Sequence, residues 1–182
     1  MESAVLILGD PVLLRISKEI TDFSDDSFRA NVSILEKALE EFRRKNGYGR
    51  GIAAVQIGIP SRFIALNFGK GPFVIVNPKI VSRSSEEFYL WDDCMSFPDL
   101  FVRVKRSKSI NIRYQDDCGK TLEWNNIGQA ESELLQHEID HLDGVMAIDL
   151  VEDVKDIIYK SEYNKNRDLY RSRVDYMIES TI

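Results

Sequence analysis

The chain contains only two histidines, and they stand four residues apart in the segment His137 to His141, which reads HEIDH. The preceding run from Ala130 to Gln136 consists of helix-compatible residues without Pro or Gly, and Asp143-Gly144 supplies a stop signal. On a helix, residues four apart lie on one face, so the two imidazoles can bind one ion while Glu138 stands beside it. The segment therefore predicts a metal-binding helix with a carboxylate positioned to move protons.

A catalytic ion usually takes three protein ligands and leaves one position open, so a third donor is expected elsewhere. The chain has two cysteines, Cys94 and Cys118. Without an export signal, both are expected to be free thiols. Taken alone, Cys94 is more typical of a small buried residue than of a ligand, and Cys118 lies in a predicted hairpin turn. The residues alone leave the identity of the third ligand open.

The overall composition limits the classes of function. With 182 residues, 43% of them hydrophobic, the chain fits a single domain covering residues 1–182. Its net charge of -6 gives no footprint for general binding to DNA or RNA. No apolar run is long enough to span a membrane, and no signal peptide is evident, so we expect a cytoplasmic protein.

Hydrophobic periodicity predicts an α+β fold with antiparallel sheets around the metal-binding helix. Apolar residues at steps of three and four predict an N-terminal helix over Ser24 to Lys45. Short runs rich in β-branched and aromatic residues predict strands, and the last two of them suggest a hairpin closed by Asp116 to Gly119. The glycine-rich segment Gly49 to Gly58 is expected to form a tight loop. Residues 151–182 are expected to form a C-terminal helical extension. The predicted strands cover Arg62–Phe68, Phe73–Val76, Phe88–Trp91, Phe101–Val104, Ser109–Tyr114 and Lys120–Trp124.

Three ordered segments resemble the peptide deformylase family. The family pattern is G-x-G-hydrophobic-A-A-x-Q, then E-G-C-x-S, then H-E-x-D-H. Here these motifs stand as Gly49 to Gln56, Asp92 to Ser96 and His137 to His141. The opening Leu6 to Arg15 is also similar, so the resemblance spans about residues 5 to 150.

The resemblance implies a ferrous ion, replaceable by zinc, nickel or cobalt, that is held by Cys94, His137 and His141. The donor types agree with this assignment, because a thiolate and two imidazoles suit borderline-soft divalent metals, whereas Mg²⁺ and Ca²⁺ prefer oxygen. When bound, such an ion lowers the pKa of water from about 15.7 towards 7.

The same resemblance implies a role for each remaining motif residue. Glu138 accepts the proton of the attacking water and passes it to the leaving amine. The side-chain amide of Gln56 and the backbone N–H of Met95 stabilise the charge that develops on the carbonyl oxygen. The substrate implied is the N-formyl-methionine terminus of a nascent peptide, and the products are formate and a free amino terminus. The resemblance leaves open whether residues 151–182 contact the ribosome.

Other residues near the predicted site are candidates for substrate binding or for supporting the metal ligands. Gly51, Ile52 and Leu134 are candidates for lining the substrate side-chain pocket. Asp140 either orients a ligand histidine, pairs with an arginine such as Arg106, or is a plain surface carboxylate.

The chain also departs from the family pattern close to the metal. Asp92 and Asp93 replace Glu and Gly before the cysteine, and Met95 replaces the usual Leu or Val after it. Val55 precedes Gln56, and Arg50 fills the variable position between two glycines. We therefore expect an active enzyme with an altered substrate preference at the site entrance.

Two other classes of function remain to be distinguished. A zinc endopeptidase shares H-E-x-x-H and often takes its third ligand downstream, for which Glu152 and Glu162 are candidates. In a non-enzymatic protein, either the chain would only bind formylated or ribosomal partners or the ion would only stabilise the fold. Such a site would be closed by a fourth ligand, for which Cys118 is the one sulfur candidate.

Overall fold

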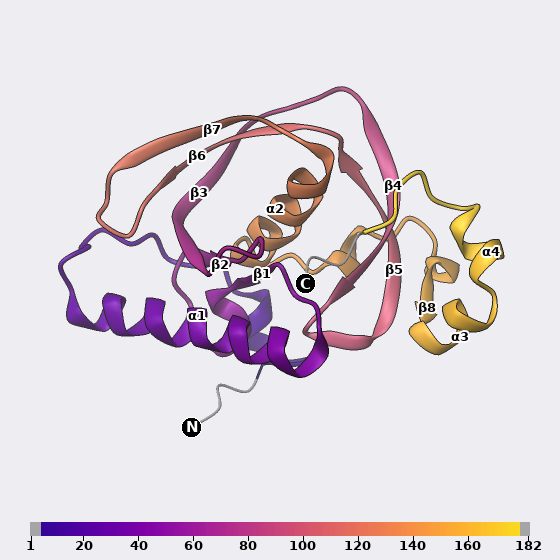
Figure 1. Cartoon of the computed structure of the whole chain (residues 1–182), viewed down its shortest axis with the longest axis horizontal. Coiled ribbons are helices and arrows are strands. Elements are labelled where there is room, and N and C mark those ends of the chain that lie inside the picture. The colour runs from indigo at the N-terminus through magenta and orange to yellow at the C-terminus, as the bar shows by residue number, and fades with distance from the viewer. Residues whose placement is uncertain (1–4, 179–182) are drawn as a thin grey trace.

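The computed structural model describes residues 5–178, and in it one helix, α2, lies between two antiparallel β-sheets (Figure 1). The elements in chain order are η1 (Pro11–Leu14), α1 (Asp26–Asn46), β1 (Gly51–Ala53), η2 (Ala54–Ile57), β2 (Phe63–Leu66), β3 (Phe73–Arg83), β4 (Glu87–Cys94), β5 (Phe97–Ser107), β6 (Ile110–Gln115), β7 (Thr121–Ile127), α2 (Gln129–Leu142), η3 (Ala147–Leu150), η4 (Val154–Asp156), β8 (Ile157–Tyr159), α3 (Lys160–Lys165) and α4 (Arg167–Arg171), where η marks a 3-10 helix.

Helix α1 forms where the sequence predicts it, and capping residues define both ends. The Asp25 side chain accepts a hydrogen bond from the Ser27 backbone N–H at 2.9 Å, which satisfies one of the free donors at the start of the helix. Gly47 ends the helix in the left-handed region with φ 74°, a conformation that glycine adopts without steric cost. The buried face of α1, with Leu35 and Leu39, packs in one cluster with Ile52 of β1.

The first sheet has five strands in the order β1-β2-β3-β6-β7, all antiparallel. Its inner face contributes fully buried residues such as Ile64 and Ile112 to one apolar cluster. Leu135, Ile139 and Leu142 of α2 belong to the same cluster. This packing fixes the rotation of α2 about its axis and so determines which of its side chains face the other sheet.

The second sheet has three strands in the order β4-β5-β8. Strands β4 and β5 form a hairpin whose register shifts between Asp92 and Cys94. Cys94 pairs with Phe97, which leaves Met95 and Ser96 as the turn. The irregularity at this end of the hairpin places Cys94 beside α2.

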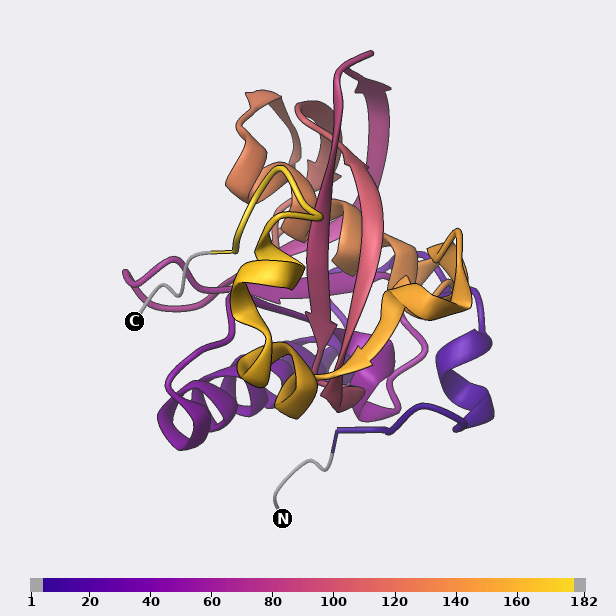
Figure 2. The same ribbon diagram turned by 90° about the vertical axis from the view of Figure 1, so that its right-hand side faces the viewer.

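Residues 151–182 were expected to be helical, and in the described part, residues 151–178, the structure has four short elements, of which the first is the 3-10 helix η4; residues 179–182 lie outside the described residues. Strand β8 pairs with β5, and the two short helices α3 and α4 follow it. These helices lie on the side of β4 and β5 that faces away from α2 (Figures 1 and 2). There Trp91 packs against Tyr163 and Tyr170, and its indole N–H donates to the Tyr170 carbonyl at 2.8 Å.

The predicted α+β class with antiparallel sheets, a central helix and a helical C-terminal segment is confirmed. Two local predictions need correction. The segment Gly49 to Gly58, expected to be a loop, contains β1 and a 3-10 helix, because the backbone of Gly51 to Ala53 pairs with β2. Strands β3 and β5 each extend to 11 residues, well beyond their apolar runs. Within residues 5–178, no helix is both long and apolar enough to cross a membrane.

Candidate active site

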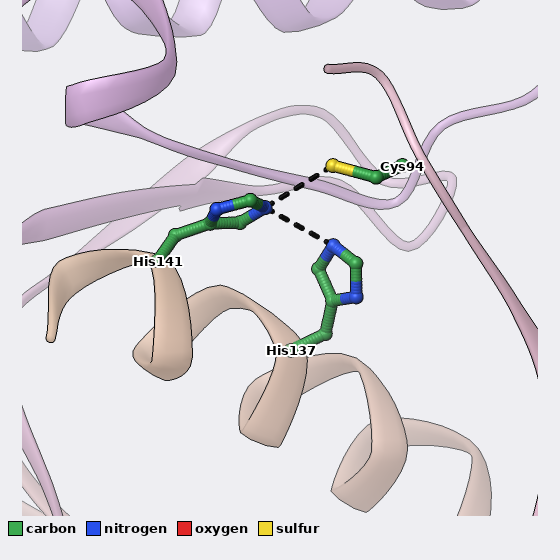
Figure 3. A group of neighbouring side chains, drawn as sticks. All are labelled: Cys94, His137 and His141. Carbon is green, nitrogen blue, oxygen red and sulfur yellow. Dashed lines mark hydrogen bonds between the residues drawn. The ribbon is translucent and has the colours of Figure 1, made fainter. Parts of the chain in front are cut away.

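Three potential metal ligands meet in the interior between α2 and the end of β4. The Nε2 atom of His141 lies 3.2 Å from the Sγ atom of Cys94 and 3.2 Å from the Nε2 atom of His137. One ligand atom from each residue lies within 4.8 Å of the others, and all three side chains are buried. Figure 3 shows both imidazoles projecting from the helix toward the cysteine. The helical spacing of four and the β4–β5 turn together produce this convergence.

Two N–H donors surround the Cys94 sulfur. The backbone N–H of Ser96 and the side-chain Nε2 of Gln56 each lie 3.4 Å from Sγ. These two contacts hold the Cys94 side chain in place beside α2.

A buried chain of charges fixes the orientation of His137. Its Nδ1 atom lies 2.9 Å from Oδ2 of Asp92. Arg106 donates to Asp92 at 3.2 Å and also pairs with Asp140. Hydrogen bonding of Nδ1 to a carboxylate leaves the opposite nitrogen, Nε2, facing Cys94 and His141, which is the usual arrangement around a ligand histidine. Of the three roles considered for Asp140, the structure places it in the ion pair with Arg106.

The buried charges around His137 favour positive charge at the cluster formed by Cys94, His137 and His141. Burial raises the pKa of Asp92, but His137 and Arg106 outweigh burial and lower it to about 2. Burial lowers the pKa of His137, yet Asp92 and Cys94 together raise it well above its usual value. Burial and the neighbouring His137 lower the pKa of His141, which keeps that imidazole neutral. The Cys94 sulfur and two imidazole nitrogens that meet at one point, with the negative charge of Asp92 behind His137, fit a divalent cation.

Glu138 lies beside the ligands, and its carboxylate is buried. No partner is recorded within residues 5–178 for its Oε2 atom. Burial raises the pKa of Glu138 to about 7, with His137 acting in the opposite direction. A Cβ atom built on Gly51 would lie 2.8 Å from Glu138 Oε1, so the carboxylate occupies space that only a glycine leaves free. A carboxyl group with this pKa can both accept and donate a proton near neutral pH.

Comparison with known proteins agrees with this geometry. The family model described as polypeptide deformylase matches residues 3–156 of the chain. The chain belongs to the polypeptide deformylase family. A relative from Thermotoga petrophila, named peptide deformylase, is 35% identical over 158 residues, which cover 87% of this chain and 92% of the relative.

Solved structures of the polypeptide deformylase family share the fold. The crystal structure of peptide deformylase from Thermotoga maritima is 33% identical, has a TM-score of 0.74 and is matched over 82% of this chain and 97% of its own. A deformylase from Acinetobacter baumannii, solved with Met-Ala-Ser bound, is 25% identical with a TM-score of 0.71 over 81% of this chain and 97% of its own. Polypeptide deformylases are metal-dependent, and in this member Cys94, His137 and His141 form the candidate metal site.

Gln56 and Met95, the other two motif residues of this deformylase, border the ligand cluster. Gln56 is buried, its Oε1 atom accepts from the Ala53 backbone at 2.9 Å, and its amide N–H group therefore points toward Cys94. Met95 lies in the β4–β5 turn, directly after Cys94. Both residues line the same pocket as His137 and Glu138.

The pocket next to the metal site contains two of the three predicted substrate-binding residues. Gly51 and Leu134 line it, together with Glu133 and Arg50. Ile52 is fully buried in the cluster between α1 and the first sheet. Because successive side chains of a strand point to opposite faces, the neighbour of a pocket-facing Gly51 packs into the core instead.

The structure also tests the residues nominated for the two rival functions. Glu152 accepts from the Tyr89 hydroxyl and pairs with Lys105, and Glu162 pairs with Lys165. Both carboxylates are therefore engaged at the surface, away from the ligand cluster. Cys118 is exposed in the β6–β7 turn and is not part of the group formed by Cys94 and the two histidines.

Two features of this deformylase site escaped the sequence analysis. The contact between Asp92 and His137 joins residues 45 apart, and an ion pair between Arg50 and Glu133 joins residues 83 apart. The sequence signals were a charged residue, Arg50, at the variable position of the glycine motif and the replacement of the family's Glu by Asp92. Their partners, Glu133 and His137, lie on α2, and the packing of α2 against the first sheet determines which of its side chains face the pocket. Only the folded structure therefore identifies these pairs.

Proposed function

We propose that the protein is a metal-dependent amide hydrolase that removes the formyl group from the N-terminal formyl-methionine of newly made polypeptides and releases formate. The observation that carries this proposal is the buried Glu138 carboxylate beside the converged donors Cys94, His137 and His141. Membership of the polypeptide deformylase family supports the choice of substrate. Such a substrate places the activity in the compartment where polypeptides are made.

The chain's own residues divide the chemistry between them. Cys94, His137 and His141 hold one divalent ion, and Asp92 keeps His137 oriented for that task. When bound, the ion supplies Lewis acidity that polarises a carbonyl and lowers the pKa of water toward neutrality. Glu138 accepts a proton from the attacking water and delivers it to the nitrogen of the departing amine. The raised pKa of Glu138 supports both halves of this transfer.

Negative charge that develops on the formyl oxygen needs donors that are already in place. We assign this role to the side-chain amide of Gln56 and the backbone N–H of Met95. The hydrogen bond from Ala53 to Gln56 Oε1 supports the assignment, because it holds the amide with its N–H side toward the site. Gly51 and Leu134 contribute to the pocket for the first side chain of the substrate.

We propose Fe²⁺ as the native ion, with Zn²⁺, Ni²⁺ and Co²⁺ as replacements. One thiol and two imidazoles form a mixed soft and borderline donor set that accepts all four metals, whereas a Mg²⁺ site would be built from oxygen ligands. The metal content of protein purified without oxygen, measured by elemental analysis, tests this assignment.

The test of the function is formate release from formyl-Met-Ala-Ser by anaerobically purified, Fe²⁺-loaded protein. A Glu138→Ala variant with equal metal content is the control. Release that collapses in the variant supports a deformylase in which Glu138 moves the proton. Cleavage of an internal peptide bond in a peptide with a blocked terminus would instead indicate an endopeptidase. Binding without release from folded, metal-loaded protein would indicate a non-catalytic role.

A further inference from the structure

The pocket that contains Glu138 also contains a buried ion pair, formed by Arg50 and Glu133. The Arg50 side chain is 11% exposed and the Glu133 side chain is 2% exposed. Arg50 also donates to the Ala130 carbonyl at 2.8 Å, which holds its guanidinium group against the first turn of α2. The pair is therefore a fixed part of the pocket wall, and it belongs to neither the ligand set nor the proton transfer.

The position of the pair follows from helix geometry. Glu133 lies four residues before His137 on α2, so its side chain occupies the same face of the helix, one turn away from a metal ligand. Arg50 directly precedes Gly51, which contacts Glu138. A substrate whose reacting carbonyl lies beside Glu138 therefore extends its neighbouring groups into a cavity with this ion pair in its wall.

Stability does not explain why two charges are buried here. Removing two charged groups from water costs free energy that their mutual attraction often fails to recover, and apolar pairs of similar volume are frequently as stable or more stable. A buried pair in a substrate cavity has a consequence for recognition, however. An apolar group placed against it displaces water without replacing the lost hydrogen bonds, whereas a polar group can replace them.

We propose that the Arg50–Glu133 pair determines side-chain specificity, and that it lets the pocket accept a polar first residue of about methionine's length in addition to methionine itself. A terminal carboxamide suits the pair, because its N–H group can donate to Glu133 while its oxygen accepts from Arg50. The class of substrate inferred is a formylated peptide whose first side chain ends in a hydrogen-bonding group. This inference rests on the proposed deformylase function.

The experiment compares kcat/KM for formyl-Met-Ala-Ser and formyl-Gln-Ala-Ser at pH 8, because methionine and glutamine have similar length. The formyl-norleucine peptide serves as the apolar reference without sulfur. The comparison is repeated in the double variant Arg50→Met/Glu133→Leu, which removes both charges and leaves neither one unpaired. In the variant we expect the ratio of kcat/KM for the Met peptide to kcat/KM for the Gln peptide to rise by about tenfold, which is within the range of one pocket contact. The norleucine-to-Gln ratio of kcat/KM should rise by the same factor.

Two controls separate specificity from damage to the fold. The double variant Arg113→Met/Glu123→Leu removes an exposed ion pair between β6 and β7 and should leave the ratio unchanged. The swap Arg50→Glu/Glu133→Arg keeps a charged pair in the wall and should keep the ratio within about threefold of the wild type. Metal content and the thermal midpoint are measured for every variant. Binding of the products Met-Ala-Ser and Gln-Ala-Ser by calorimetry gives the same comparison without turnover.

The outcomes are distinguishable. A Met-to-Gln ratio that rises at least fivefold in the charge-free variant supports the inference, and a smaller or opposite change overturns it. If the wild-type protein releases formate from the peptides but the ratio does not depend on the pair, only the specificity inference fails. If the metal-loaded protein releases formate from none of them, the proposed function fails and the inference fails with it.

Discussion

Gly51 and Glu138 lie so close together that a Cβ atom on Gly51 would stand 2.8 Å from the Glu138 Oε1 atom. The first residue belongs to β1 and the second to α2, so the glycine strand passes directly over the carboxylate. The absence of a side chain on Gly51 is therefore a requirement of the site, and it explains why a short strand begins with glycine next to the proposed proton carrier.

Replacing Gly51 with alanine should displace the Glu138 carboxylate and lower kcat by about 10² or more, the contribution typical of a general base. Metal content should stay at the wild-type level, because the ligands lie on other residues. The matched control is Gly128→Ala at the start of α2, where a new Cβ meets only ordinary contact distances. Equal kcat values for the two variants would contradict the steric argument.

The Glu138→Gln variant should lose about 10² to 10⁴ in kcat while it keeps the shape of the side chain and the bound metal. Steady-state formate release and elemental analysis on the same sample measure both quantities. Glu131→Gln, in the first turn of the same helix and outside the pocket, should behave as wild type. Full activity of the Glu138→Gln variant would exclude proton transfer by this residue.

Neutralising Asp92 should weaken metal binding. In Asp92→Asn the carboxylate that holds His137 Nδ1 is lost, and changes of this kind typically reduce metal affinity by about 10- to 100-fold. Competition with a chelator gives the affinity. Asp140→Asn removes the other partner of Arg106 without touching His137, so it should retain metal better, and a reversed order would refute the orienting role of Asp92.

Asp93 and Lys160 form an ion pair between the end of β4 and the start of α3, at 2.6 Å. Asp93 also lines the pocket, so Asp93→Gly should leave metal content unchanged and alter the ranking of peptides that differ after the first residue. Lys160→Met breaks the same pair from the other side and should shift the ranking in the same direction. An unchanged ranking in Asp93→Gly would show that the entrance does not select substrates.

Glu133 should make stability depend on pH. Burial raises the pKa of Glu133 from 4.5 to about 7, against the opposing effect of Arg50. Between these two pH values the Glu133 carboxyl group is therefore protonated in the folded chain and ionised in the unfolded chain. The resulting stabilisation is complete below pH 4.5, declines as the pH rises and is lost above about 7. At 1.36 kcal/mol per unit, the full change is about 3 kcal/mol.

In the Glu133→Gln variant this dependence disappears. Urea unfolding of wild type and variant, both metal-loaded, should therefore show the variant gaining most of that free energy relative to wild type between pH 5 and 8. Comparing the two proteins at each pH cancels the pH dependence of metal binding itself. Parallel stability curves would show that Glu133 has the same pKa in the folded and unfolded chains.

Local patterns predicted the long elements and failed for the short ones. Helices α1 and α2 carry several turns of periodic apolar residues, and their limits were predicted to within a few residues. Strands β1 and β8 have three residues each, which is too short for a period to appear, and pairing partners far along the chain determine them.

The candidate site likewise contains residues that local sequence patterns predicted and residues that they did not. The two histidines and Glu138 follow from the spacing within one helix, whereas Cys94 was identified as the third ligand only through the family resemblance. No sequence spacing relates Arg50 to Glu133 or Asp92 to His137. These pairs depend on how β1 and β4 pack against α2, and that packing is a property of the whole core.

Strand β8 has a consequence for any shortened form of the protein. It occupies the outer edge of β5, pairing Leu100 to Val102 with Ile157 to Tyr159. Ending the chain at residue 150 would leave the backbone N–H and C=O groups of that edge open to another copy and would uncover Trp91. Open edges of this kind are sites of strand-to-strand association. A truncated protein made to test whether the C-terminal segment is dispensable should therefore aggregate before its activity can be judged.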